Sequence, residues 1–520
     1  MNDKLDKSGL TAETPSILPG LKKAGVGIHF ASLAGAYGIG DIGDSALAFI
    51  DKLVDMKVHV WQFLPTGPTA YGDSPYQPLS AFAGNEMLIG IEPLVQLGLL
   101  STGEAETLTG LPFGYVDYGQ LIPKKHALLN LAAERFSAVA SAGLQEAYKR
   151  FLESHGELWL NDYAVYRILK TIHGERPWPE WDSSFVHRDP GAMQQIETSH
   201  CKAIENIKVT QFLFDQQWQA LRQYAGECSV LLFGDMPIYI ALDSADAWAH
   251  PEILMVDHDG RPSHIAGVPP DYFSEDGQLW GNPLYDWSFH ESNGYQWWIE
   301  RIKHAAGQMD LVRIDHFRGF EAYWSVEFGA ETARNGQWVP GPGAALFDSM
   351  KEALGSLPIV AEDLGVITPE VDALRHRHNI PGMKVLQFEV GDPAFDLSNI
   401  HENCVCYTGT HDNDTTVGWF NGGNEDTRSE QEVMETRRNA LNITGGKAET
   451  IHQDMIRLAF NSQARLAIVP MQDLLGLDSD ARLNTPGTTS NNWRWRVTEE
   501  QVSPVFCKSI ANLIEETARS

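Results

Sequence analysis

The sequence predicts an α/β fold, a (β/α)₈ barrel formed by one unit over residues 1–520, with large helical and loop insertions between barrel strands. Eight short runs of branched or aromatic residues end abruptly at polar, Gly or Pro residues. Segments with helical periodicity, such as 45–56 and 294–306, lie between many of them. Apolar strands that alternate with helices are typical of a parallel sheet buried on both faces, and eight of them close a barrel. The runs are 26–30, 58–64, 229–233, 311–314, 359–361, 385–388, 405–407 and 466–469.

The uneven spacing of these runs predicts three insertions. About 160 residues separate the second run from the third, more than the dozen or so that a crossover needs. We therefore expect a mostly helical insertion over residues 66–228, with helices at 144–152 and 209–224. A loop insertion is expected over 241–300, after the third strand, and a helical insertion over 413–460, after the seventh.

The composition and charge exclude several classes of partner. The chain of 520 residues is 43% hydrophobic and 21% charged, as in an ordinary globular protein. Its formal charge of −30, from 69 acidic and 39 basic side chains, would repel phosphate backbones and anionic lipid surfaces. No run approaches the roughly 18 apolar residues that span a bilayer. We therefore expect no nucleic-acid or membrane partner, whereas a neutral sugar suits an acidic surface.

Cysteine usage and the N-terminal segment predict a cytoplasmic protein. Residues 1–20 are polar and lack the apolar stretch of a secretory signal peptide. The five cysteines are an odd, scattered set, which is typical of reduced intracellular thiols. Cys404 and Cys406 alternate along an apolar run, so we expect buried strand positions and no metal. A monomer and a homodimer are both compatible with the sequence.

Acidic residues follow several of the predicted strands. Asp235, Asp315, Glu362 and Asp412 come at or after the ends of the third, fourth, fifth and seventh runs. In a barrel of this kind, catalytic residues lie where strands end and the following loops begin. A single carboxylate there usually caps a loop or forms a salt bridge. Several carboxylates that face one cavity raise each other's pKa, a strain that folds tolerate mainly at functional sites.

Two carboxylates that flank a bond are the minimum equipment for cleaving an acetal. We assign Asp315 as the nucleophile, because Arg313, two residues earlier, shares its strand face and can orient its carboxylate. The same spacing is also compatible with a plain ion pair. Glu362 is our candidate acid/base, in drier surroundings that raise its pKa. Asp412, with His411, would hold sugar hydroxyls and stabilise developing oxocarbenium charge, although a His-Asp pair is often structural.

Aromatic residues in polar, Gly/Pro-rich loops favour a sugar ligand. Tyr71, Tyr76, Tyr272, Trp280 and Trp493 lie in such loops. Pyranose rings present apolar faces that stack on aromatic side chains, while Asp, Asn and Gln bind the hydroxyls. Some of these rings could instead pin down long loops.

A G-x-G-x-x-G match at Gly38, Gly40 and Gly43 raises the alternative of a dinucleotide site. Such a site places the glycines directly after a strand, whereas about seven residues intervene here. Asp41 and Asp44 would also face the pyrophosphate. We therefore expect no NAD and no other cofactor.

Long ordered motifs cover most of the chain. They are GIGDIG, WQFLPTGPTAYGDSPYQPLSAFAGN, GDMPIYIALDSADAW, AGVPPDYFSEDGQLWGNPLYDW, VRIDHFRG, VAEDLG, YTGTHDNDTT, PMQDLLG and RLNTPGTTSNNWRWR. Together they resemble glycoside hydrolase family 77, the amylomaltases or disproportionating enzymes. The resemblance implies a catalytic (β/α)₈ barrel without a cofactor. It also implies retaining transfer of an α-1,4-glucan segment from a maltooligosaccharide, starch or glycogen donor to glucose or another glucan.

The same resemblance implies roles for individual residues. By motif position, Asp315 is the nucleophile, Glu362 the acid/base and Asp412 the transition-state stabiliser. The residues implied around the cleaved sugar are Asp235, Arg313 and His411. The implied glucan-binding positions are Ser74, Tyr76, Asp271, Gln278, Trp280 and Asn484, which makes 241–300 a glucan-binding insertion. The segments HFASLAGAYG and LPTGPTA depart from the usual family motifs, and Thr66 and Ala70 of the second could alter the binding of glucan near Tyr71.

Two alternatives to a transferase remain open at this point. A hydrolase would use the same carboxylates, with water in place of the acceptor sugar. The long loops around 71–85 and 250–285 favour transfer, because they could exclude water and hold an acceptor. A glucan-binding protein on an inactive barrel is disfavoured by the intact set Asp315, Glu362 and Asp412.

Overall fold

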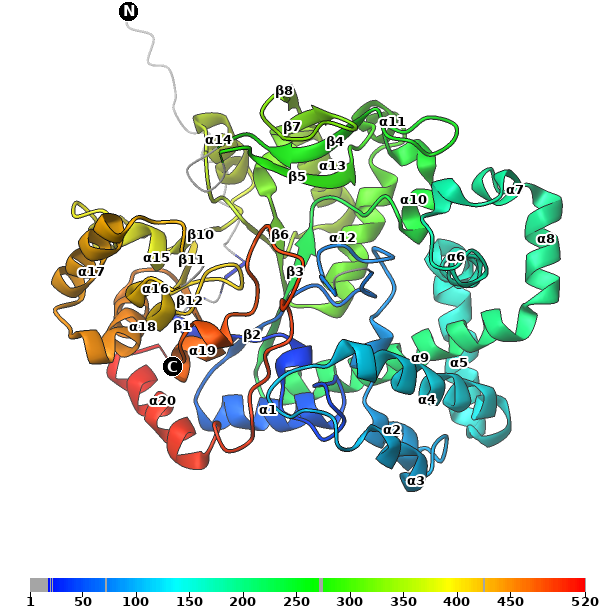
Figure 1. Ribbon diagram of the computed structural model, residues 1–520, viewed down its shortest axis with the longest axis horizontal. Coiled ribbons are helices and arrows are strands. Elements are labelled where there is room, and N and C mark those ends of the chain that lie inside the picture. The colour runs from blue at the N-terminus through cyan, green and yellow to red at the C-terminus, as the bar shows by residue number, and fades with distance from the viewer. Residues whose placement is uncertain are drawn as a thin grey trace, which may run out of the picture.

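The computed structural model describes residues 17–18, 20, 22–70, 73–270, 275–423 and 426–519. Eight parallel strands form its centre (Figure 1), in the order β10-β11-β12-β1-β2-β3-β6-β9. The two end strands of this order approach each other, and the backbone N–H of Ala361 donates to the carbonyl of Pro381 at 2.8 Å. The barrel is therefore nearly closed, which confirms the predicted fold class. Its strands are β1 (Lys23–Gly27), β2 (Val60–Gln62), β3 (Leu231–Pro237), β6 (Leu311–Asp315), β9 (Ile359–Ala361), β10 (Gly382–Val385), β11 (Cys404–Tyr407) and β12 (Leu466–Pro470).

Alternate residues of these strands pack into one core cluster inside the barrel. Seven strands each contribute to it, through Val60, Phe233, Leu311, Val360, Met383, Val405 and Leu466. The eighth strand, β1, brings Gly25 close to this cluster, where a Cβ would come 2.2 Å from Ile468 Cδ1. Cys404 and Cys406 are buried strand residues, as predicted, and they pack outward into the main core while Val405 points inward. This alternation leaves the polar strand-end residues to form the mouth of the barrel.

Two predicted strands run past the observed strand into a helical turn. The apolar run 385–388 straddles the end of β10, and Leu386–Glu389 form the short helix α15. The run 26–30 likewise covers the end of β1 and enters a 3₁₀ turn at Phe30–Ser32. Both errors have one cause, because a short buried apolar run reads the same in a strand and in a helical turn.

Helices fill the long segment between β2 and β3 and extend to one side of the barrel (Figure 1). Both segments expected to be helical here are helical, since 144–152 lies within α5 and 209–224 within α9. Helix α9 packs on α4 and α6 and buries an apolar stripe that includes Phe212 and Leu221. These helices are α2 (Ile91–Gln96), α3 (Thr102–Ala105), α4 (Tyr118–Val139), α5 (Ala142–His155), α6 (Asn161–Ile172), α7 (Ser183–Val186), α8 (Pro190–Ser199) and α9 (Cys201–Glu227).

A second, antiparallel sheet follows the barrel strands β3 and β6, in the order β5-β4-β7-β8. Its strands are β4 (His264–Val268), β5 (Gln278–Pro283), β7 (Ala322–Glu327) and β8 (Gln337–Pro340). The turn Phe317–Phe320 joins β6 directly to β7, so the sheet is anchored at the mouth of the barrel. The sequence predicted a loop insertion over 241–300, where β4 and β5 lie, and no strands at β7 and β8. The strands of this sheet carry no clean hydrophobic alternation, and β5 contains Gly281 at φ 77°.

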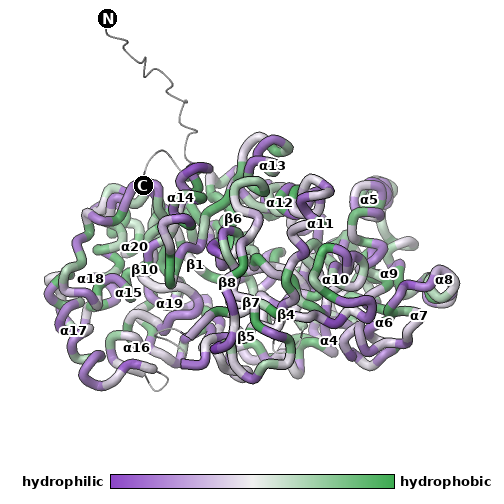
Figure 2. The backbone as a smooth tube through the Cα atoms, turned by 90° about the horizontal axis from the view of Figure 1, so that it is seen from above, coloured by the Kyte–Doolittle hydropathy of each residue, from purple (hydrophilic) through white to green (hydrophobic). Residues whose placement is uncertain are grey.

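The remaining helices surround the barrel or extend from its other side. Helices α16 (Thr416–Asn421), α17 (Glu430–Thr444) and α18 (Ile451–Asn461) follow β11, and they lie at the end of the molecule opposite α5 and α8 (Figures 1 and 2). Helix α20 (Pro504–Glu516) packs on α1 (Asp44–Asp55). Helices α12 (Gln296–Gln308), α13 (Ala344–Leu354) and α14 (Pro369–Arg377) follow β5, β8 and β9. None of the helices in the described ranges has the length and apolar character needed to cross a membrane.

Candidate active site

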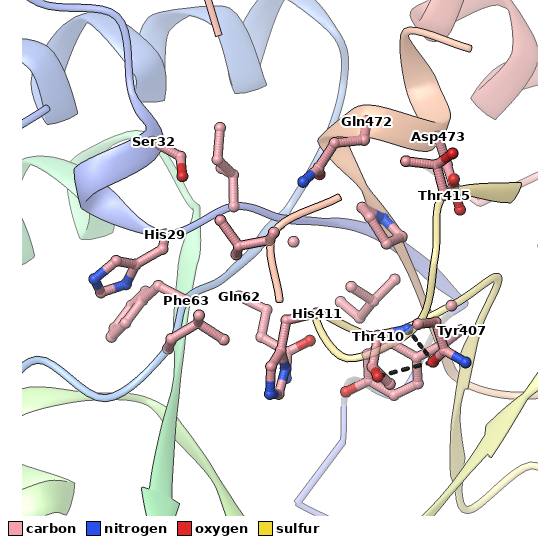
Figure 3. A pocket seen from close by; sticks show the side chains of 18 of the residues that line it. His29, Ser32, Gln62, Phe63, Tyr407, Thr410, His411, Thr415, Gln472 and Asp473 are labelled. Atoms are coloured by element: carbon pink, nitrogen blue, oxygen red, sulfur yellow. Dashed lines mark hydrogen bonds between the residues drawn. The ribbon is translucent and has the colours of Figure 1, made fainter. Parts of the chain in front are cut away.

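The carboxyl ends of the barrel strands surround a cavity. Residues from β3, β6 and the loops after β1, β2, β11 and β12 line it, and Figure 3 shows His29, Gln62 and His411 around it. Asp235 and Asp315 stand at the ends of β3 and β6, and Glu362 follows β9 directly. The acidic residues that follow the strands therefore lie at one end of the barrel, as expected from the sequence.

Arg313 joins two of the carboxylates. Its Nη1 donates to Asp235 Oδ2 at 2.6 Å, and its Nη2 donates to Asp315 Oδ1 at 2.8 Å. Asp235 and Arg313 are register partners on β3 and β6, while Asp315 follows on the same face of β6. Burial lowers the pKa of the Arg313 guanidinium, but the charges of Asp235 and Asp315 raise it by more. The net pKa is raised, so Arg313 stays charged. The side chain of Asp315 is 34% exposed and that of Arg313 only 6%, so a buried cation orients a partly exposed carboxylate.

Asp235 is the most deeply buried member of this group. Its Oδ2 also accepts a hydrogen bond from the Tyr76 hydroxyl at 2.9 Å. Burial raises the pKa of Asp235, Arg313 lowers it, and the charge of Asp315 raises it again, with a net increase. Its Oδ1 is buried with no hydrogen-bond partner among the described residues. An acceptor of this kind at a cavity wall can bind a sugar hydroxyl.

Glu362 is held by the backbone. Its Oε2 accepts from the N–H of His316 at 2.8 Å, and its Oε1 accepts from the N–H of Leu364 at 2.9 Å. Burial and the negative charge of Asp315 raise the pKa of Glu362 to about 7, against the opposing effects of Arg313 and the two N–H groups. The backbone of His316 adopts the left-handed conformation, with φ 56° and ψ 49°. This conformation is uncommon for residues other than glycine and is often found at functional sites. Glu362 can therefore carry a proton near neutral pH.

Asp412 is held by side chains from distant parts of the sequence. Its Oδ1 accepts from Asn484 Nδ2 at 2.6 Å, and its Oδ2 lies 3.3 Å from His411 Nε2. Arg482 Nη2 donates to the carbonyl of Asp412 at 2.8 Å. Thr410 donates to Asn413 Oδ1 from both its N–H and its hydroxyl, which closes the turn that carries Asp412 (Figure 3). The side chain of Asp412 is 46% exposed.

Comparison with known proteins identifies the family of this chain. Residues 28–501 match the family model described as 4-alpha-glucanotransferase. The chain belongs to this family. It is 44% identical to the 4-alpha-glucanotransferase of Thermus thermophilus over 500 residues, which cover 95% of this chain and 98% of that relative. It is 44% identical to the 4-alpha-glucanotransferase of Synechocystis sp. over 486 residues, which cover 92% of this chain and 94% of that relative.

A solved structure supports the same 4-alpha-glucanotransferase family. The fold matches an amylomaltase from Streptococcus agalactiae, solved in complex with acarbose, with a TM-score of 0.91 and 35% sequence identity. The match covers 96% of this chain and all of that chain. The family resemblance stated from the sequence motifs is therefore confirmed over nearly the whole chain.

The positions expected to bind glucan in this family contact the carboxylate cluster to different extents. Tyr76 stacks on the ring of His411, with centroids 5.0 Å apart and an interplanar angle of 14°. Ser74 Oγ accepts from the N–H of Tyr76 at 3.3 Å and so supports this loop. Trp280 Nε1 donates to Gln278 Oε1 at 3.1 Å, and its indole meets the ring of His316 edge-on at 4.7 Å. The second sheet thus brings Gln278 and Trp280 next to the residue that follows Asp315.

Asp271 lies outside the residues that the structure describes, and so do Tyr71 and Tyr272. The other sugar and glucan positions expected for this 4-alpha-glucanotransferase family are Ser74, Tyr76, Asp235, Gln278, Trp280, Arg313, His411 and Asn484, and all are described.

Several cavity residues in this family member were not singled out from the sequence. His29 and Gln62 line the wall near β1 and β2, and burial together with His411 lowers the pKa of His29 to about 3, which makes it neutral. Asp473 is buried behind the Asp412 turn, where it accepts from the N–H of Thr416 at 2.6 Å and from the Thr408 and Thr416 hydroxyls. A polar residue inside or just after an apolar run is the signal that could have found them.

Proposed function

We propose that the protein transfers segments of α-1,4-glucan to glucose or another glucan by a retaining double displacement. The observation that carries this proposal is the pairing of Asp315, oriented by a buried Arg313, with Glu362, whose pKa is raised to about 7. A retaining glycosidase mechanism requires one ionised and one protonated carboxyl beside the same bond. The relatives named 4-alpha-glucanotransferase and amylomaltase support the choice of substrate.

In the first half-reaction, an Asp315 oxygen attacks the anomeric carbon of the donor. The glycosidic C1–O4 bond breaks, and Glu362 gives its proton to the leaving O4, which releases the shortened glucan. Asp315 is then an ester and has lost its negative charge. Because that charge was one cause of the raised pKa of Glu362, the pKa of Glu362 falls in the intermediate. The carboxylate of Glu362 is thereby prepared to act as a base.

In the second half-reaction, the 4-hydroxyl of the acceptor attacks the same carbon. Glu362 takes the hydroxyl proton, the Asp315–C1 bond breaks, and a new α-1,4 bond forms. Asp412 and His411 would hold sugar hydroxyls, and the charge of Asp412 would stabilise the oxocarbenium-like transition state. Asp235 would accept a hydrogen bond from a further sugar hydroxyl through Oδ1, which has no partner among the described residues.

We also propose that two insertions, over 66–228 and 241–300, contribute glucan-binding walls to the site through the short segments around Tyr76, Gln278 and Trp280. The first carries Tyr76, and the second carries Gln278 and Trp280. Tyr76 and Trp280 contact residues beside the catalytic carboxylates. Walls of this kind would exclude water from a bound glucan and favour an acceptor sugar.

The test is incubation of the purified protein with maltotriose, with products separated by chain length and reducing ends measured. Glucose together with maltopentaose and longer products, at a constant number of reducing ends, supports transfer. Rising reducing ends with only shorter products would instead show hydrolysis by the same carboxylates. No change in maltotriose would overturn the proposal.

A further inference from the structure

A cluster of two histidines and one aspartate lies on the surface of the helical side of the molecule, where Figure 1 places α7. His187 is the residue that ends α7, while His258 and Asp259 lie in a turn that precedes β4. One potential ligand atom from each residue lies within 4.8 Å of the other two. We propose that His187, His258 and Asp259 bind a divalent transition metal, with Zn²⁺ as the best fit. The site is independent of the proposed function.

The distances in this cluster suit a small ion. His187 Nε2 lies 3.2 Å from Asp259 Oδ1, and His258 Nδ1 lies 3.8 Å from the same oxygen. Zinc bonds of about 2.0–2.2 Å in a tetrahedral site place neighbouring ligand atoms roughly 3.4 Å apart. The two imidazole rings lie with their centroids 4.1 Å apart and an angle of 48° between their planes, and the exposed side chains of His258 and Asp259 can rotate. Small rotations are therefore enough to enclose the ion.

The donor set favours one class of cation. Two imidazole nitrogens and one carboxylate oxygen match the ligands of zinc and of Co²⁺ or Ni²⁺, with water completing the coordination. Calcium and magnesium prefer six or more oxygen ligands, which this cluster does not offer among the described residues.

His187 has the supporting contact that metal-binding histidines usually have. Its Nδ1 lies 3.1 Å from the hydroxyl oxygen of Ser183, one helical turn earlier. When Nδ1–H donates to this hydroxyl, Nε2 presents its lone pair towards Asp259. A hydrogen bond on the far nitrogen fixes the tautomer and ring orientation of a ligand histidine.

The turn that carries the other two ligands is fixed by its own hydrogen bonds. Asp257 Oδ1 accepts from the N–H groups of Asp259 and Arg261, both at 2.9 Å. Gly260 has φ 77°, and a Cβ at this position would come 2.0 Å from the buried ring of Trp178. The turn is thus packed against the insertion that also carries His187. A bound metal would link two segments that are far apart in sequence, and the rigid turn lowers the entropy cost of binding.

The alternative is that His187 and Asp259 form a simple surface ion pair. The two possibilities differ in what His258 does, because an ion pair does not need it. In a metal site, loss of either histidine removes a ligand and abolishes high-affinity binding. In a simple pair, neither variant changes metal uptake.

The experiment uses the full chain without a histidine tag, treated with a chelator and then dialysed. Zn²⁺ binding is measured by isothermal titration calorimetry, and Co²⁺ binding by visible absorption, which reports tetrahedral coordination. We expect one high-affinity ion per chain in the unmodified protein. His187→Ala and His258→Ala should each abolish it, and Ser183→Ala should weaken it about 10-fold. His401→Ala, which removes an exposed histidine just before β11, should bind like the unmodified chain.

Folding and glucan transfer provide the checks on the variants. All three ligand residues are exposed, so circular dichroism and maltotriose conversion should be unchanged in the histidine variants. Equal zinc uptake by the unmodified protein and by the double variant His187→Ala/His258→Ala would overturn the proposal. Absence of uptake by the unmodified chain would overturn it as well, and neither result would affect the proposed glucan chemistry.

Discussion

Glu362 and Asp412 are two carboxylates of one site that the chain holds in opposite ways. Glu362 accepts two hydrogen bonds from backbone N–H groups at the ends of β6 and β9. Asp412 accepts from the side chain of Asn484, a residue 72 positions away, and contacts His411. The first half of the site is thus built by the barrel itself, and the second by loops that meet over it. We expect substitutions in the first half to act through charge and protonation, and those in the second to act through position.

The largest expected effect is at Asp315, the proposed nucleophile. Asp315→Asn removes the nucleophile and should lower kcat on the order of 10⁴-fold, because no covalent intermediate can form. Binding of maltooligosaccharide, measured by calorimetry, should persist. Asp348→Asn, on the exposed surface of α13, is a matched loss of one charge and should leave kcat unchanged. Substantial turnover by Asp315→Asn would mean that another residue is the nucleophile.

The barrel-built half predicts a pH effect. Glu362→Gln should lower kcat about 10²- to 10⁴-fold, the usual contribution of a general acid/base. In the unmodified enzyme the rate should fall as pH rises through about 7, since Glu362 then loses the proton that the leaving group needs. The residual activity of Glu362→Gln should not show this decline with pH. If the decline persists in the variant, another group is responsible for it.

The same raised pKa has a consequence for stability. Between pH 4.5, the ordinary value for Glu, and about 7, the folded protein keeps a proton at Glu362 that the unfolded chain has lost. The free energy of unfolding contributed by this group therefore falls as pH rises through that window. Glu362→Gln should flatten this decline in denaturant titrations at several pH values. An unchanged slope would show that the carboxyl is not held protonated by the fold.

The loop-built half predicts a smaller effect without a change in the pH profile. Asn484→Ala frees Asp412 Oδ1 and should lower kcat roughly 10- to 100-fold, because the carboxylate loses its fixed orientation. Asn484→Asp places a like charge 2.6 Å from that oxygen and should cost more than the alanine variant. If the aspartate variant is as active as the alanine variant, Asn484 does not act through Asp412.

The two halves also differ in how far the sequence predicted them. The Arg313–Asp315 pair follows from the period of two along one strand, and Glu362 follows from the end of the next barrel strand, so local patterns were sufficient. The contact between Asn484 and Asp412 joins distant segments and was not predicted, because the family resemblance implied only a glucan-binding role for Asn484. No local pattern encodes such a contact, because loop packing depends on the whole fold.

The errors in the fold have the same origin. The barrel was predicted because its strands are buried on both faces and end sharply. The second sheet was missed because β5 is half-exposed and contains Gly281, so it carries no alternating pattern. The sixth barrel strand was predicted too far towards the C-terminus, because one apolar run covers the end of β10 and most of α15. Burial marks a segment as part of the core but does not reveal its backbone conformation.

Tyr76 contacts both halves of the site, so its variants can separate the contribution of each half to glucan binding. Its hydroxyl donates to Asp235 in the barrel-built half, while its ring stacks on His411 in the loop-built half. Tyr76→Phe removes only the first contact and should lower kcat/KM about 5- to 10-fold, the net value of one typical hydrogen bond. Tyr76→Ala also removes the stack and should lower it further, mainly by raising KM. Steady-state kinetics with maltotriose distinguishes these outcomes, and equal losses in both variants would mean that the stack on His411 contributes nothing to glucan binding.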